Sequence, residues 1–151
     1  MNEILFKFMI IGFLFPIPLN NKMNFIGNNF SNITVKINGT GHKKIFSDSI
    51  STFSYPKQVY INGIRQNIVN YTYDLNETEN LILLVWDDGF NDCDQMFSRC
   101  RDISEIDVST FNFSSVIYFD SMFYGCSNLT SINFSNFYVP NFPRIFANVK
   151  F

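Results

Sequence analysis

The sequence has few of the residues on which catalytic and nucleic-acid-binding sites depend. His42 is the only histidine among 151 residues, which argues against a histidine-rich metal site and a His-based catalytic triad. Charged residues make up 16% of the chain, and the formal net charge is −2. This charge is too close to neutral to favour nucleic acid or an anionic membrane. We therefore expect no enzymatic activity, no metal or other cofactor, and no nucleic-acid partner.

Two loops come near a known motif but lack its spacing. Residues 39–44 contain two glycines and two lysines, without the full Gly-x-x-x-x-Gly-Lys-Ser/Thr pattern of a phosphate loop. A turn with exposed lysines is the expectation there. Asp87, Asp88, Asp92 and Asp94 surround Gly89 and offer oxygen ligands for Ca²⁺, but at spacings that do not match an EF-hand. A solvated acidic loop is the preferred interpretation.

The chain also lacks a hydrophobic run long enough to cross a membrane. In residues 1–19, Lys7 precedes an apolar run from Phe8 to Phe15 that extends to Leu19. This run is shorter than the ~20 residues of a membrane-spanning helix and resembles the centre of a signal peptide. We predict a signal peptide at 1–19, with an uncleaved signal anchor or a buried strand as alternatives. The protein would then be secreted or displayed at the cell surface, with an anchor as its only membrane contact.

Asparagine-linked glycosylation motifs support this prediction of export. Eight Asn-x-Ser/Thr sequons occur along the chain, a pattern that fits a secreted surface. Two of them, at Asn128 and Asn133, belong to a repeat that is described below. The residues that we predict as N-glycosylation sites are Asn32, Asn38, Asn70, Asn76 and Asn112.

The amino-terminal half suggests a small β module. Residues 20–32 are polar and without periodicity, as in a linker. Residues 33–37 then alternate strictly and end at Asn38-Gly39, which is the signal of a strand followed by a turn. Residues 58–61 end at Asn62-Gly63 in the same way, and residues 68–75 alternate again. We assign residues 33–79 to this module.

The carboxy-terminal half repeats itself. Residues 93–118 return as residues 119–142 with an offset of 26 residues (119 − 93), and such a period indicates a solenoid. The apolar run at 81–86 falls into the same register, so we predict residues 80–92 as a degenerate capping coil. A partial repeat would follow at 143–151. The residues 76–151 carry four Lys/Arg against ten Asp/Glu, which disfavours a nucleic-acid-binding solenoid.

The repeat pattern Met-Phe-x-x-Cys-x-x-Leu-x-x-Ile-x-Phe-x-x-Phe, complete at residues 122–137, resembles the BspA-like leucine-rich repeat of surface proteins, also called the DUF285 repeat. The resemblance covers about a third of the chain (residues 93–142). It implies a right-handed solenoid with one short parallel strand per coil, exported to the cell surface for adhesion. The predicted fold class is thus mostly β: a small N-terminal β module followed by a short leucine-rich-repeat solenoid at 80–151.

Within this solenoid the apolar positions predict a core and the polar positions between them predict a surface. The core would be Met96, Phe97, Cys100, Ile106, Val108 and Phe111, with their counterparts Met122, Phe123, Cys126, Ile132, Phe134 and Phe137. The outward strand face, which repeat proteins use for binding, would be Glu105, Asp107, Ser109, Ser131, Asn133 and Ser135. A merely solvated sheet face is the alternative.

The three cysteines, an odd number, leave their pairing open. Cys100 and Cys126 occupy the same phase of consecutive repeats, so they are expected to stack as small buried hydrophobes. A disulfide between them is the alternative, because stacked coils lie within disulfide range. Cys93 would be free or paired with Cys100.

These observations favour an interaction or adhesion module at the cell surface that binds a protein or glycan ligand. Two alternatives remain open. One is a truncated, non-functional fragment of a longer surface protein, and the other is a glycan-binding or carbohydrate-active β domain.

Overall fold

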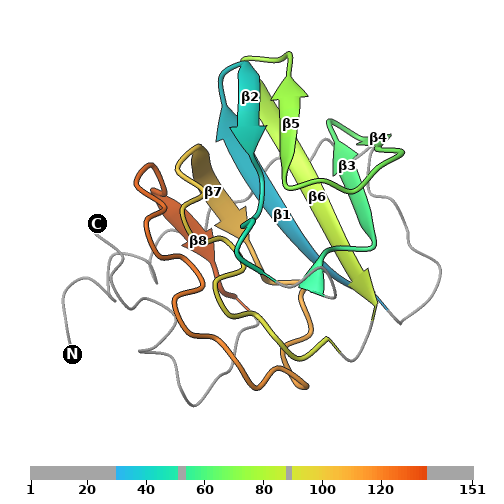
Figure 1. The fold of residues 1–151 in the computed structure, drawn as a ribbon, viewed down its shortest axis with the longest axis vertical. Coiled ribbons are helices and arrows are strands. Elements are labelled where there is room, and N and C mark those ends of the chain that lie inside the picture. The colour runs from blue at the N-terminus through green and yellow to red at the C-terminus, as the bar shows by residue number, and fades with distance from the viewer. Residues whose placement is uncertain (1–29, 51–53, 88–89, 136–151) are drawn as a thin grey trace.

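The computed structural model describes residues 30–50, 54–87 and 90–135, and these ranges form two β-sheets (Figure 1). The larger sheet has six strands in the order β4-β3-β6-β1-β7-β8, and the smaller one pairs β2 with β5. The strands are β1 (Phe30–Asn38), β2 (Gly41–Lys44), β3 (Gln58–Ile61), β4 (Ile64–Arg65), β5 (Thr72–Leu75), β6 (Glu79–Asp87), β7 (Ile103–Asp107) and β8 (Ser131–Asn133).

Strand β1 is the centre of the larger sheet. It pairs antiparallel with β6 along its whole length and antiparallel with β7 on its other side. Its strict alternation places Ile33, Val35 and Ile37, all 0% exposed, on the face that packs into the core. Thr34 and Lys36 therefore point to the opposite face, since successive side chains of a strand alternate between faces.

The predicted leucine-rich-repeat solenoid is wrong. Strands β7 and β8 do pair in parallel, with Ile106 opposite Ile132, but β1 lies antiparallel between β6 and β7. The run at 81–86 was expected to stack on the following repeat as a capping coil. It is instead the interior of β6, which hydrogen-bonds to β1 and β3. The result is a mixed sheet in a sandwich-like arrangement without solenoid closure.

Residues 81–86 of β6 are apolar because the strand is buried in the sheet, and not because it stacks on the repeats as a capping coil. A strand can carry apolar residues on both faces where both of its faces are covered. In β6, Leu84 and Trp86 face the core, and Val85 is also fully buried although its side chain points to the other face. The resemblance to a repeat coil at this position thus reflects burial rather than stacking.

The boundary that we placed between residues 79 and 80 does not divide the sheet. Strand β1 comes from the amino-terminal part and lies between β6 and β7 of the carboxy-terminal part. The proposed linker at 20–32 overlaps the start of β1 at Phe30, and its other residues lie outside the described ranges. Residues 1–19, Phe137 and the partial repeat at 143–151 also lie outside them. No helix in the described ranges is long and apolar enough to span a bilayer.

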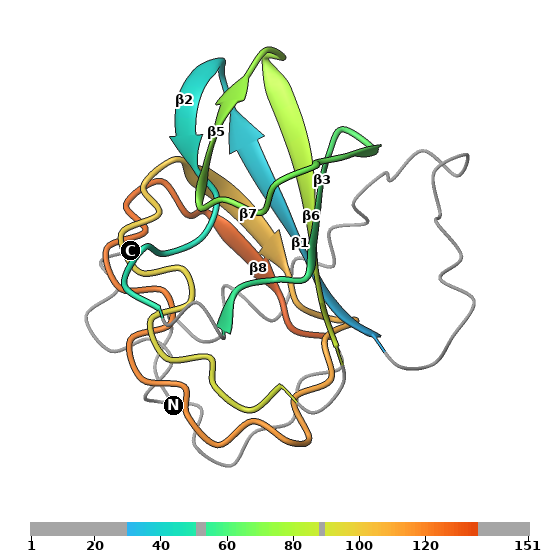
Figure 2. The same cartoon turned by 45° about the vertical axis from the view of Figure 1, so that its right-hand side comes forward.

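The core lies on one side of the larger sheet. The smaller sheet and the segments that follow β2, β6 and β7 cover it (Figure 2). Ile45, Phe46 and Leu75 bring β2, β5 and their neighbouring loops into this core. The rings of Phe97 and Phe123 stack in parallel with centroids 5.8 Å apart. Of the twelve predicted core residues, Phe134 is half-buried, Phe137 is outside the described ranges, and the others are buried.

The two repeats lie against each other through their turns as well as through β7 and β8. Positive backbone φ angles recur at the repeat spacing, at Gln95 and Ser121 and at Arg99 and Gly125. A ladder of backbone hydrogen bonds joins the two copies: Cys93 N to Tyr118 O (2.9 Å), Gln95 N to Asp120 O (3.0 Å), Phe97 N to Met122 O (2.9 Å) and Arg99 N to Tyr124 O (2.6 Å).

The two predicted Asn-Gly turns are confirmed. Asn62 and Gly63 have φ angles of 50° and 82° and join β3 to β4, as expected for a tight hairpin turn. Gly39, with a φ of 89°, follows the last residue of β1.

Candidate functional site

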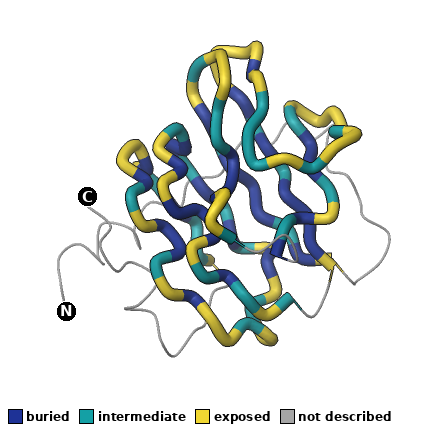
Figure 3. The backbone as a smooth tube through the Cα atoms, viewed as in Figure 1, coloured by how far each residue is buried: buried dark blue, intermediate teal, exposed yellow. Residues whose placement is uncertain are grey.

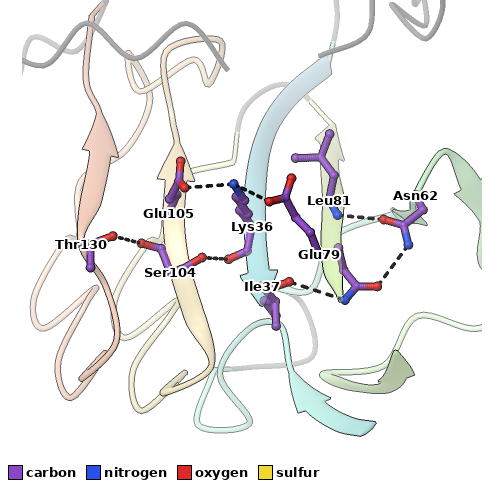
Figure 4. Close-up of polar contacts among 9 residues, drawn as sticks. Lys36, Ile37, Asn62, Glu79, Leu81, Ser104, Glu105 and Thr130 are labelled. Carbon is purple, nitrogen blue, oxygen red and sulfur yellow. Dashed lines mark hydrogen bonds and ion pairs between the residues drawn. The ribbon is translucent and has the colours of Figure 1, made fainter. Parts of the chain in front are cut away.

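The face of the larger sheet opposite the core carries a charged cluster at its centre. Lys36 of β1 reaches between two carboxylates, with its Nζ 2.9 Å from Glu79 Oε2 of β6 and 3.2 Å from Glu105 Oε1 of β7 (Figure 4). The side chains of Lys36 and Glu105 are 22% and 23% exposed, while that of Glu79 is 67% exposed. We call this surface, formed by β6, β1, β7 and β8, the outer face.

The two carboxylates change the proton affinity of the lysine. The hydrogen bond to Glu79 raises the pKa of Lys36 above 10.5, burial opposes this increase, and Glu105 adds to it. Lys36 is therefore a fixed cation at neutral pH, held by partners on both neighbouring strands.

Towards the edge of the sheet the outer face becomes acidic and rich in amide and hydroxyl groups. Asn133 Nδ2 of β8 donates to Asp107 Oδ2 of β7 at 3.1 Å, and the backbone of Ser109 donates to Asp107 Oδ1 at 2.8 Å. Ser135 donates to Asn133 Oδ1 through its backbone N at 3.1 Å and through its hydroxyl. These bonds hold the polar groups in a defined arrangement on two neighbouring strands.

The structure brings most of the predicted binding face together. Glu105 lies opposite Ser131, and Asp107 lies opposite Asn133 in the parallel pair. Ser109 follows β7 and Ser135 follows β8. Ser135 is exposed and the other five residues are half-buried, so much of their hydrogen-bonding capacity is used within the protein.

Sequence reasoning missed the contribution of β1 and β6 to this face. The alternation of residues 33–37 puts Lys36 on the face opposite the core, but nothing in the sequence indicated that β1 lies beside β7. Ser104 of β7 also connects β1 to the second repeat. Its hydroxyl donates to Lys36 O at 3.1 Å, and its carbonyl accepts from Thr130 Oγ1 at 3.0 Å (Figure 4). The outer face is thus one continuous surface rather than a repeat surface alone.

The three cysteines are buried and free, so neither proposed pairing is present. Cys126 Sγ donates to Phe97 O at 3.0 Å, and burial raises the pKa of Cys126 to about 12. Burial also raises the pKa of Cys93 and Cys100 well above 9.0. A thiol of high pKa in an apolar site carries little thiolate, which is the nucleophilic and metal-binding form. The cysteines therefore fill space in the core.

The two near-motifs are used in other ways. Residues 41–44 form strand β2, where Lys43 Nζ pairs with Asp102 at 3.0 Å and Lys44 Nζ pairs with Asp48 at 2.7 Å. The expectation of exposed lysines is therefore wrong, because both side chains are half-buried. His42 pairs with Asp74 at 3.0 Å on the surface.

Among the described residues no group of three or more His, Cys, Asp or Glu side chains is arranged to hold a metal ion. Asp88 of the candidate calcium loop lies outside the described ranges. Asp94 accepts a hydrogen bond from the backbone of Asp120 at 2.6 Å. Its pKa is raised, chiefly by burial and also by the nearby Asp92 and Asp120.

The predicted glycosylation sites differ in exposure. Asn38, Asn70, Asn76 and Asn112 are exposed, whereas Asn32 is half-buried within β1 and accepts a hydrogen bond from Thr110 Oγ1 at 2.7 Å.

Comparison with protein-family models, with curated proteins and with solved structures finds no match to this chain.

Proposed function

We propose that this chain is an exported interaction module that binds a protein partner at the cell surface through the outer face, without catalysis. The observation that carries the proposal is the charged cluster of Lys36, Glu79 and Glu105 with the adjoining Asp107. With three carboxylates and one ammonium group, these four residues have a net charge of −2 (+1 − 3). Such a surface complements a partner that presents lysine and arginine side chains.

A binding role fits the fixed geometry of this surface. Its side chains are held by hydrogen bonds and ion pairs across β6, β1, β7 and β8, so little side-chain entropy is lost when a partner docks. Catalysis by a cysteine nucleophile has less support, because the thiols are buried with raised pKa values.

Export is supported by the apolar stretch within residues 1–19 and by the sequons. The resemblance of the repeat motif to that of BspA-like surface proteins points in the same direction. It supports the location of the protein and not its fold.

The test is a binding screen with the full chain displayed on a cell surface, against extracellular-matrix proteins and cell-surface glycans. A protein ligand found in this way is then measured with the double variant Glu105→Gln/Asp107→Asn, which we expect to weaken binding at least about tenfold, with a steeper loss at low salt. Glu77→Gln removes one carboxylate from the exposed β5–β6 turn, where Glu77 takes no part in the ion pairs of the cluster, and serves as the control. Equal binding by the double variant and the control would refute the assignment of the outer face. A ligand that is a neutral glycan would refute the charge argument.

A further inference from the structure

Two sequons lie in neighbouring turns at one end of the molecule. Asn38 starts the sequon in the turn between β1 and β2, and Asn76 starts the sequon in the turn between β5 and β6. A backbone hydrogen bond from Gly39 N to Thr78 O at 2.7 Å joins the two turns. Figure 3 shows that this end is largely exposed.

The buried side chain of Asn80 holds these two turns together through hydrogen bonds to a backbone carbonyl of each. It is 0% exposed and donates to Glu77 O at 2.9 Å and to Gly39 O at 3.1 Å. The backbone of both turns is therefore held in place while the asparagines at their start stay in solvent.

Each of these sequons offers its asparagine and its hydroxyl residue to solvent. Asn38, Thr40, Asn76 and Thr78 are all exposed. Among the residues that the structure describes, neither the Asn38 amide nor the Asn76 amide is used in a side-chain hydrogen bond. A sugar on either nitrogen would break no contact of the fold.

We infer that Asn38 and Asn76 both accept N-linked glycans, that these two glycans stand at the turn end of the molecule, and that the sequon at Asn133 on the outer face stays unmodified. The inference rests on the export included in the proposed function. It adds that the glycans leave the proposed binding surface uncovered.

The chemistry is a glycosyl transfer from a lipid-linked oligosaccharide diphosphate. The asparagine Nδ2 forms a bond to the anomeric carbon of the first sugar, the bond between that carbon and the diphosphate oxygen breaks, and the lipid diphosphate leaves. One amide proton passes to a base of the transferase. No oxidation or reduction takes place, and the amide carbonyl of the asparagine is retained.

Asn133 differs from the turn asparagines at the atom that would react. Its Nδ2 donates to Asp107 Oδ2 at 3.1 Å within the parallel β7–β8 pair. A sugar on this nitrogen would crowd the Asp107 carboxylate and cover the outer face between β7 and β8. A chain modified there would lose the contact that joins the two side chains.

The experiment expresses the full chain in a eukaryotic secretory host and maps glycans by glycopeptide mass spectrometry before and after glycosidase treatment. Thr40→Ala and Thr78→Ala each destroy one turn sequon at an exposed residue, and Ser135→Ala destroys the sequon at Asn133. We expect each of the first two variants to lose one glycan and Ser135→Ala to lose none. A glycan on the Asn133 peptide, or unmodified Asn38 and Asn76 in secreted protein, would overturn the inference.

A second form of the chain, with residues 1–19 replaced by a proven signal peptide, separates this inference from the proposed function. If glycans appear at Asn38 and Asn76 only in the second form, the site assignment is supported and export by the native leader is refuted. If the second form is secreted without glycans at these two residues, the site assignment itself is refuted.

Discussion

Replacement of Asn80 by alanine should destabilise the protein far more than its place next to a surface turn suggests. Asn80 donates to the carbonyl oxygens of Glu77 and Gly39 at 2.9 and 3.1 Å, and its Oδ1 accepts from Asn62 Nδ2 at 3.1 Å. A third carbonyl, that of Ile37, lies 3.5 Å from the same amide nitrogen. The side chain thus ties together the turns between β1 and β2, β3 and β4, and β5 and β6.

The size of the effect follows from these contacts. A neutral hydrogen bond contributes about 1 kcal/mol net to stability, and a buried group left without its partner costs more. Three good bonds give an expected loss of about 3 kcal/mol in the free energy of unfolding for Asn80→Ala. This is a large part of the ~5–15 kcal/mol that stabilises a typical domain, and corresponds to a fall in Tm of roughly 10 °C.

The assay is equilibrium unfolding in urea, followed by circular dichroism, on the full chain. Asn67, which is exposed in the loop after β4, provides the matched control, and Asn67→Ala should cost less than about 0.5 kcal/mol. Asn62→Gly removes the partner amide but tolerates the φ of 50° at that position, because glycine adopts positive φ readily. A double-mutant cycle should then give a coupling of about 1 kcal/mol between Asn62 and Asn80. Equal costs for Asn80→Ala and Asn67→Ala, or no coupling with Asn62, would refute this role of Asn80.

Two further predictions concern the core between the repeats. Phe97→Ala should lower the free energy of unfolding by about 3–5 kcal/mol, since this ring is fully buried and stacks on Phe123. The control Ile117→Ala, at a residue that is 68% exposed, should lower it by under about 1 kcal/mol in the same urea assay. Similar losses for the two variants would contradict the packing of Phe97. Stability should also fall at alkaline pH. Burial raises the pKa of Cys126 from the 9.0 of a solvent-exposed thiol to about 12 in the fold, so the unfolded chain loses this proton first. The contribution of this thiol to the free energy of unfolding should therefore be constant below pH 9 and then decrease by about 1.4 kcal/mol per pH unit as the pH rises towards 12. Cys126→Ala should reduce that slope, and an unchanged slope would show that its thiol does not titrate in this way.

Local patterns in the sequence were sufficient to predict several elements. The Asn-Gly dipeptides predicted the turn between β3 and β4 and the end of β1, because asparagine and glycine accept the positive φ that such turns require. The repeated apolar positions predicted which side chains are buried at residues 96–132, since a side chain that recurs at one phase of stacked segments meets the same neighbours.

The arrangement of these elements could not be predicted in the same way. Residues 81–86 match the repeat register in their apolar positions, and burial of side chains on both faces of β6 produces the same pattern as stacking in a solenoid. A strand that is covered on both faces carries no mark of which strand lies beside it. For the same reason nothing in the sequence indicated that Lys36 is the partner of Glu105, which follows it by 69 residues (105 − 36).

The sequence by itself determined strands β1 and β3, the tight turns, the buried positions of the repeats and the sequons, because each depends on residues close together in the chain. The tertiary structure decided that β1 lies between β6 and β7, and with it the mixed sheet, the Lys36 cluster of the outer face and the pairing of the two sequon-bearing turns through Asn80. These features join residues that are far apart along the chain, and pairing between distant strands is set by the packing of the whole core rather than by any local pattern.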